Sequence, residues 1–151
     1  MELDLTKRES QRLTEMINKA MQQITRFSSE EWEFREKPGK WSKKEILGHL
    51  IDSAANNHLR FVRAQLAESE FISFNYEQDF YVSCQQYQQS KVENLLLLWS
   101  AYNHHIAHIM NHINPEKLNL VCKIGNYEPV SLGFLVKDYV DHLAHHLKQL
   151  Y

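Results

Sequence analysis

Hydrophobic residues recur every three or four positions along most of the chain, with polar and charged residues between them. This spacing places the apolar side chains along one face of a helix. Four such stretches predict four long helices, over about residues 6–25, 42–68, 90–114 and 131–151. The chain contains only 4 Gly and 3 Pro, which agrees with long helices that few turns interrupt.

Local signals indicate where the predicted helices begin and end. Residues 42–45 (Ser-Lys-Lys-Glu) and 90–93 (Ser-Lys-Val-Glu) have the spacing of a capping box, in which the serine and glutamate side chains each bond a free amide at the helix start. Ser131 is the expected N-cap of the last helix. Pro115 is expected to end the third helix because it has no amide hydrogen to donate.

Two connections have patterns of their own. Residues 70–89 are rich in aromatic and polar side chains and predict a long crossover with a short helical turn. Polar and apolar residues alternate over 117–130, with a turn signal at Gly125-Asn126, which predicts a small β-hairpin or an extended loop. The whole pattern predicts an all-α fold: a four-helix bundle with a long crossover and a small hairpin before the last helix.

The composition and charge of the chain narrow the class of protein. With 151 residues, 43% of them hydrophobic, and no repeat or linker, we expect a single domain over residues 1–151. The net charge of -2 and the lack of a basic cluster argue against a nucleic-acid partner. No apolar run approaches the roughly 20 residues that span a bilayer, and the first residues lack the apolar core of a signal peptide. With only 2 cysteines, the chain is expected to be cytoplasmic.

The chain contains 9 histidines, and helical phase separates candidate metal ligands from the others. His142 and His146 lie four residues apart on the side of the last helix that faces the bundle interior, while His145 faces solvent. His49 lies in a polar stripe beside the apolar face of the second helix. Two imidazoles from one helix and a third from another can bind a divalent cation and leave positions open for water or substrate, as in a catalytic site.

Two alternatives stay open on the residues alone. The third predicted helix carries a second series with ligand spacing, His104, His108 and His112, but helical phase places His104 and His108 away from the core and His112 at its boundary. The pair on the last helix is also compatible with core histidines that are hydrogen-bonded and bind no metal.

Two sequence blocks resemble the DinB/YfiT-like superfamily. Residues 40–53 (KWSKKEILGHLIDS), followed by residues 56–61 (NNHLRF), resemble that family's second helix, and residues 139–150 (YVDHLAHHLKQL) resemble its last helix. The layout agrees over nearly the whole chain. The resemblance implies a four-helix bundle whose metal site takes one histidine from the second helix and two from the fourth. Carried over by motif position, these are the same histidines that helical phase selects.

The resemblance also implies an enzyme. Members of the superfamily include metal-dependent hydrolases and S-transferases that use a low-molecular-weight thiol such as bacillithiol or mycothiol. We therefore expect an S-transferase in which the metal activates a thiol cosubstrate, with a hydrolase that activates water as the alternative. A second alternative is a non-catalytic, stress-related binding module. The expected cofactor is a divalent metal ion, zinc by preference, with nickel, iron or manganese as alternatives.

Several polar residues that follow His49 in the sequence are candidates for substrate binding. Arg60 lies about 20° around the helix from His49 and about three turns along it, so it either binds a carboxylate of the substrate or thiol, or forms a surface salt bridge. Asn57 and Tyr76 are further candidates for lining a pocket. Asp52 is expected either to orient His49 as a hydrogen-bond acceptor or to pair with a basic neighbour. The expected partner is a small-molecule substrate, and the aromatic crossover offers a contact for a homodimer.

Overall fold

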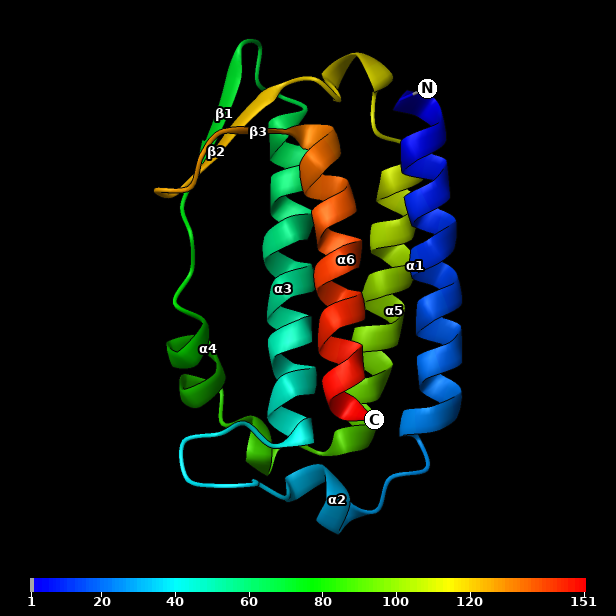
Figure 1. Cartoon of the computed structure of the whole chain (residues 1–151), viewed down its shortest axis with the longest axis vertical. Helices are drawn as coiled ribbons and strands as arrows, with labels where there is room; N and C mark the ends of the chain where they lie inside the picture. The colour runs from blue at the N-terminus through cyan, green and yellow to red at the C-terminus, as the bar shows by residue number, and fades with distance from the viewer. Residues whose placement is uncertain (1) are drawn as a thin grey trace.

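The computed structural model describes residues 2–151, with side chains from residue 5 onward. Its long helices are α1 (Glu2–Ile24), α3 (Lys43–Ala64), α5 (Val92–Asn111) and α6 (Leu132–Leu150). Both α1 and α3 pack against α5 and against α6, so the four helices surround a common core (Figure 1). The prediction of a four-helix bundle is confirmed.

Shorter elements connect the long helices at both ends of the bundle. They are α2 (Ser29–Glu33), β1 (Glu70–Ser73), α4 (Gln78–Cys84), the 3₁₀ helix η1 (Tyr87–Gln89), the 3₁₀ helix η2 (Pro115–Lys117), β2 (Val121–Ile124) and β3 (Val130–Ser131). The strands lie beside the end of α3 and the start of α6, whereas α2 lies at the opposite end of the bundle (Figure 1). The crossover from α3 to α5 therefore starts at the sheet, passes through α4 and returns along α3.

The strands form a three-stranded sheet in the order β1-β2-β3. β2 and β3 are antiparallel and make the hairpin that the alternating pattern predicts. β1 belongs to the crossover and pairs in parallel with β2, so that Phe71 lies opposite Cys122 and both side chains are buried. The sequence does not predict β1, because so short a segment becomes a strand only by pairing with a partner far along the chain.

Hydrogen bonds at the helix starts confirm part of the predicted capping and correct the rest. Ser42 accepts a hydrogen bond from the amide of Glu45 (3.1 Å), and the carboxylate of Glu45 accepts one from the amide of Ser42 (3.0 Å), so the first capping box is confirmed. Ser131 caps α6 as predicted. The second capping box is wrong. α5 starts later, and the amide of Ser90 instead donates to the carbonyl of Tyr87 (3.0 Å) and closes η1.

Other boundaries also differ from the prediction. The segment before α3, expected to be only a connection, contains α2, which starts with a capping box formed by Ser28 and Glu31. The side chain of Trp32 is buried and packs edge-on against Phe27, which anchors this short helix. α5 ends earlier than predicted, and Pro115 starts η2 instead.

Buried apolar side chains from all the long helices form the core. Fully buried examples, one from each long helix, are Ile17, Leu50, Trp99 and Val136. In the described part of the chain, no helix combines the length and the apolarity that a membrane crossing requires.

A glycine in α3 lets the crossover pack closely against this helix. A Cβ atom on Gly48 would lie 2.2 Å from Cδ2 of the Tyr87 ring, far inside van der Waals contact. The hydroxyl of Tyr87 donates to the carboxylate of Asp52 (2.6 Å), which holds the ring over α3. Because Gly48 precedes His49, this contact covers the turn of α3 that carries the histidine.

The substitution Gly48→Ala tests this contact. Alanine is favoured over glycine inside a helix by about 1 kcal/mol, but overpacking a buried site typically costs about 1–3 kcal/mol. We therefore expect a net decrease in the free energy of unfolding, measured in urea. In a Tyr87→Ala background the ring is absent, and the same substitution should be neutral or stabilising. A Gly48→Ala protein as stable as the wild type would contradict the close packing.

Candidate metal centre

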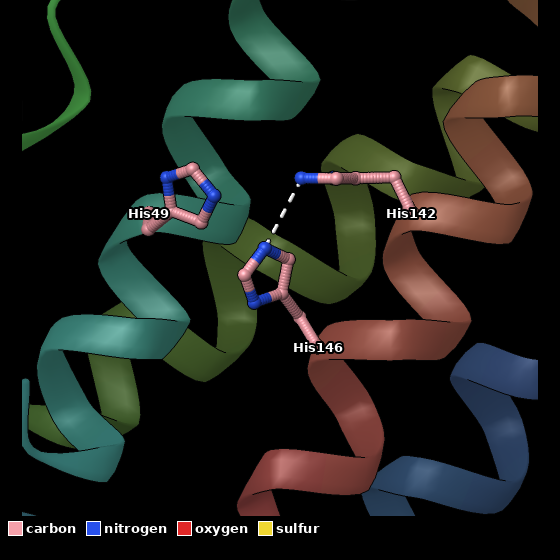
Figure 2. Close-up of side chains that lie close together, drawn as sticks. All are labelled: His49, His142 and His146. Atoms are coloured by element: carbon pink, nitrogen blue, oxygen red, sulfur yellow. Dashed lines mark hydrogen bonds between the residues drawn. The ribbon is translucent and has the colours of Figure 1, made fainter.

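Three histidines from α3 and α6 converge inside the bundle (Figure 2). His49 extends from α3, and His142 and His146 extend toward it from successive turns of α6. The ring centroid of His49 lies 4.7 Å from that of His146 and 5.6 Å from that of His142, and the two rings of α6 are 4.4 Å apart. One nitrogen from each ring lies within 4.8 Å of the others. The structure thus brings together the histidines that the sequence indicates as metal ligands.

The ring of His49 is fully buried, and no other described residue forms a hydrogen bond with it. Its exposed fraction is 0%, and among the described residues neither Nδ1 nor Nε2 has a partner. A buried polar group without a partner typically costs about 1–3 kcal/mol. A cation bound by one of these nitrogens would offset part of that cost. The residues present therefore fit a metal ion.

Hydrogen bonds orient the two rings of α6. Nδ1 of His146 donates to Oε1 of Gln149 (2.9 Å), which leaves Nε2 of the neutral ring as an acceptor that faces the other histidines. This Nε2 lies 3.1 Å from Nε2 of His142, the dashed contact in Figure 2. The sequence analysis did not single out Gln149. Gln149 could have been found from the sequence, because it follows His146 by three residues on the same helix and so lies beside it.

Burial keeps these imidazoles neutral. Burial, followed by the nearby rings of His146 and His142, lowers the pKa of His49 to about 3. Burial, followed by His146, lowers the pKa of His142 to about 4, and burial also lowers the pKa of His146. The neutral imidazole is the form that binds metals. Near neutral pH the cluster therefore offers a set of uncharged nitrogen donors, which suits zinc, nickel or iron.

A hollow of about 760 Å³ opens beside His146. The lining side chains most relevant to a ligand are Phe34, Lys40, Trp41, Lys43, Ile46 and Gln149. The ring of Trp41 lies 5.0 Å from that of His49, so this tryptophan contacts both the hollow and the buried histidine. The volume and the mixture of apolar and polar groups suit a small-molecule ligand.

The loop between α2 and α3 forms one side of this hollow and is held by a bidentate ion pair. Arg35 donates from Nε to Oε1 of Glu45 (2.8 Å) and from Nη2 to Oε2 (3.0 Å). Burial raises the pKa of Glu45, but hydrogen bonds from Arg35 and Ser42 outweigh it and hold the pKa below its usual value. The sequence analysis missed Arg35, because its contact with α3 depends on the path of the loop.

Asp52 does not form the hydrogen bond with His49 that we expected. Its Oδ1 accepts hydrogen bonds from the hydroxyl of Tyr87 (2.6 Å) and from Nε2 of Gln85 (2.8 Å). Its Oδ2 has no partner among the described residues. A step of three residues turns a side chain about 60° around the helix, so Asp52 faces the crossover instead of α6. Its carboxylate fastens the crossover to α3.

Asn57 and Tyr76, both predicted to bind substrate, are not among the residues that line the hollow beside His146. Their side chains contact α3 instead. The side-chain amide of Asn57 donates to the carbonyl of Ser53 (2.9 Å) on its own helix. Tyr76 is buried close to the side chain of Ser53, and burial raises the pKa of its hydroxyl to about 12. Tyr76 therefore packs the crossover against α3.

Arg60 lies at the other end of α3 from the histidines. It follows His49 by 11 residues, which corresponds to roughly 16 Å along the helix. Its Nη2 donates to the carbonyl of Phe74 (3.2 Å), and the expected surface salt bridge is absent from the described residues. The structure places Arg60 in a second hollow, separate from the one beside His146.

The remaining candidate histidines do not join the cluster. His145 is exposed, as its helical phase predicts. The second series is also exposed: His104 and His108 lie on α5, and His112 follows its last residue. Within the described residues, the converging rings on α3 and α6 form the one group of three or more His, Cys, Asp or Glu that could hold a metal ion.

The substitution Glu45→Gln tests whether the ion pair holds the loop. Glutamine can still complete a capping box, so the change removes the charge and leaves the helix start intact. Arg35 is 47% exposed, so we expect a loss in unfolding free energy of at most about 1 kcal/mol, with faster amide hydrogen exchange over residues 34–41. Glu93→Gln, at the exposed start of α5, is the matched control.

Acidification is also expected to loosen the loop over residues 34–41. The pKa of Glu45 is lower in the folded protein than its ordinary value of 4.5, so the ion pair stabilises the loop fully above that pH, and the stabilisation is lost as the pH falls below it. If the exchange rates over residues 34–41 are the same in Glu45→Gln and the wild type, the ion pair does not hold the loop.

Comparison with known proteins agrees with the fold. The structure is similar to that of YfiT from Bacillus subtilis, with a TM-score of 0.83 and 18% sequence identity, and the match covers 96% of this chain and 85% of that chain. YfiT is described as a probable metal-dependent hydrolase with an unusual four-helix bundle topology. No curated protein matches this sequence. Residues 12–150 match the DinB superfamily, and the chain therefore belongs to that superfamily.

Proposed function

We propose that this protein is a metal-dependent enzyme that acts on a small molecule bound beside His146. The observation that supports this most strongly is the convergence of three histidines, one of which is fully buried and has no hydrogen bond to either ring nitrogen among the described residues. His146 also lines a hollow of about 760 Å³, so a ligand there has access to the cluster. Membership of the DinB superfamily and the fold shared with YfiT agree with this proposal.

The finer proposal is an S-transferase that uses a low-molecular-weight thiol. A divalent cation held by the histidines, zinc by preference, would supply a Lewis acid that lowers the pKa of the thiol. The thiol sulfur forms a bond to an electrophilic carbon, the leaving group departs with the bonding electrons, and the thiol proton passes to solvent. Within the described residues the cluster contains no carboxylate. A thiol that is already ionised needs no side-chain base, whereas water normally needs one.

The chain's own residues would bind and shield the reactants. Phe34, Trp41 and Ile46 give the hollow apolar walls that exclude water from the reacting groups. The ammonium group of Lys43 donates to the carbonyl of Leu150 and forms no ion pair among the described residues, so it adds positive charge to the lining. Because Glu31, Glu36 and Asp79 also line the hollow, this charge favours an anionic group of the ligand only beside Lys43 itself.

A hydrolase is the second candidate. It is favoured by the description of YfiT as a probable metal-dependent hydrolase. The hollow also contains acidic side chains, among them Glu31 and Asp79, that would accept a proton from an attacking water molecule.

Metal binding is tested on untagged protein by elemental analysis and by calorimetric titration with Zn²⁺. We expect His49→Ala, His142→Ala and His146→Ala each to weaken binding at least about tenfold, because each removes one of the donors of a single site. His145→Ala is the control on α6 and His104→Ala is the control on α5. Each removes an exposed histidine that is not one of the proposed ligands. Equal zinc affinity in the wild type and the three cluster variants would contradict the proposed site.

The type of reaction is tested with model substrates. We expect zinc-loaded protein to accelerate the formation of a thioether from cysteine and 1-chloro-2,4-dinitrobenzene, with release of chloride, and His142→Ala to lose most of this activity while His145→Ala keeps it. Turnover of 4-nitrophenyl acetate without a thiol would support the hydrolase instead. Tight metal binding without either activity would favour a binding module.

A further inference from the structure

The second hollow is lined by residues of α3, the hairpin and α6. This hairpin lies beside the end of α3 and the start of α6 (Figure 1). The volume of the hollow is about 470 Å³. The lining side chains that decide its chemistry are Arg60, Ile124, Tyr127, Glu128, Leu135 and Asp138. They come from α3, from the hairpin and from α6, so the hollow exists only in the folded chain.

Arg60 supplies a guanidinium group with few protein partners. Its Nη2 donates to the carbonyl of Phe74 (3.2 Å), and within the described residues no carboxylate pairs with it. Burial lowers the pKa of Arg60, and the neighbouring Tyr76 and Tyr127 oppose this effect. A partly buried guanidinium has lost hydration and still has N–H groups to donate, so it favours a carboxylate ligand, which it can bind in a bidentate manner.

Two carboxylates also line this hollow, and neither forms an ion pair within the described part of the chain. Glu128 comes from the hairpin and Asp138 from α6, and both line the hollow together with Arg60. Both side chains are exposed at the rim of the hollow. Partial desolvation, followed by the nearby Asp141, raises the pKa of Asp138, although Lys137 opposes this effect, so a cation beside this carboxylate would be favourable. The hollow therefore presents groups of both signs that do not neutralise each other within the protein.

Apolar side chains complete the hollow. Ile124 and Leu135 are 6% and 8% exposed and form an apolar surface within it. Phe134 and Tyr127 are partly exposed beside them, at 52% and 67%. A ligand that bridges the charged groups would therefore also bury an apolar side chain, which supplies binding energy in proportion to the area buried.

We propose that this hollow binds a small zwitterionic amino acid with an apolar side chain. The carboxylate would pair with Arg60, the ammonium group with Asp138 and Glu128, and the side chain would pack on Ile124 and Leu135.

This site is independent of the histidine cluster. Arg60 lies roughly 16 Å along α3 from His49, and Tyr76 packs between them, close to both Asp52 and Arg60. Amino-acid binding at the sheet end therefore requires neither the metal nor the proposed reaction, and its failure would leave the proposed enzyme function untouched.

The test uses the full chain without added metal and L-phenylalanine as the probe. Binding is followed by calorimetry and by amide chemical shifts of the hairpin and the first turns of α6. We expect binding in the millimolar range or tighter. 3-Phenylpropionate, which lacks the ammonium group, and phenethylamine, which lacks the carboxylate, should each bind at least about tenfold more weakly.

Charge variants assign the two ends of the ligand. Arg60→Gln should weaken phenylalanine binding at least about tenfold, and Arg60→Lys should lose part of the affinity because it keeps the charge without the planar fork. Asp138→Asn should weaken the binding of phenylalanine and leave that of 3-phenylpropionate unchanged. Arg63→Gln, an exposed position on the same helix, is the matched control.

Several results would overturn the proposal. These are no shift of the hairpin resonances with phenylalanine, unchanged affinity in a folded Arg60→Gln protein, or equal affinity for phenylalanine and 3-phenylpropionate. The last result would show a simple anion site. Thermal unfolding of each variant establishes that it is folded, and Arg60→Lys provides the comparison if Arg60→Gln is not.

Discussion

The packing of α3 against α6 brings a fully buried histidine of one helix into contact with two histidines of the other, and the candidate metal centre depends on this contact. The contact is unfavourable by itself, because both nitrogens of His49 lie in the interior and, in the part of the chain that the structure describes, neither has a hydrogen bond. Apolar neighbours on the same helices, such as Leu50 and Leu143, are buried and offset this cost. The fold thus holds a polar cluster that a bound cation would stabilise further.

The two ends of the bundle differ in their chemistry because different connections cover them. At one end, α2 and the loop that Arg35 ties to Glu45 enclose a hollow beside His146. At the other end, the hairpin and the start of α6 enclose a hollow that contains Arg60. The crossover runs between these ends along α3, and the hydrogen bond from Tyr87 to Asp52 fastens it there. A bundle of ordinary helices therefore carries two separate hollows.

The polar stripe on α3 shows how far a sequence pattern can be interpreted. The sequence predicts that Arg60 and Asn57 bind substrate, and that Asp52 orients His49 or pairs with a basic neighbour. In the structure Asp52 meets the crossover, Asn57 bonds its own helix and Arg60 faces the hairpin. Helical phase gives the direction of a side chain, but the element that covers it depends on the path of distant segments.

The sequence by itself determined the long helices, the caps at Ser42 and Ser131 and the pairing of His142 with His146, because these features depend on contacts within a few residues. Phase and family resemblance together also indicated His49. Only the tertiary structure decided that the ring of His49 meets the other two, since that distance depends on how α3 packs against α6. It likewise decided the strand β1, the loop that lines the first hollow and the surroundings of Arg60. Each of these depends on a partner far along the chain, and no local pattern records such a partner.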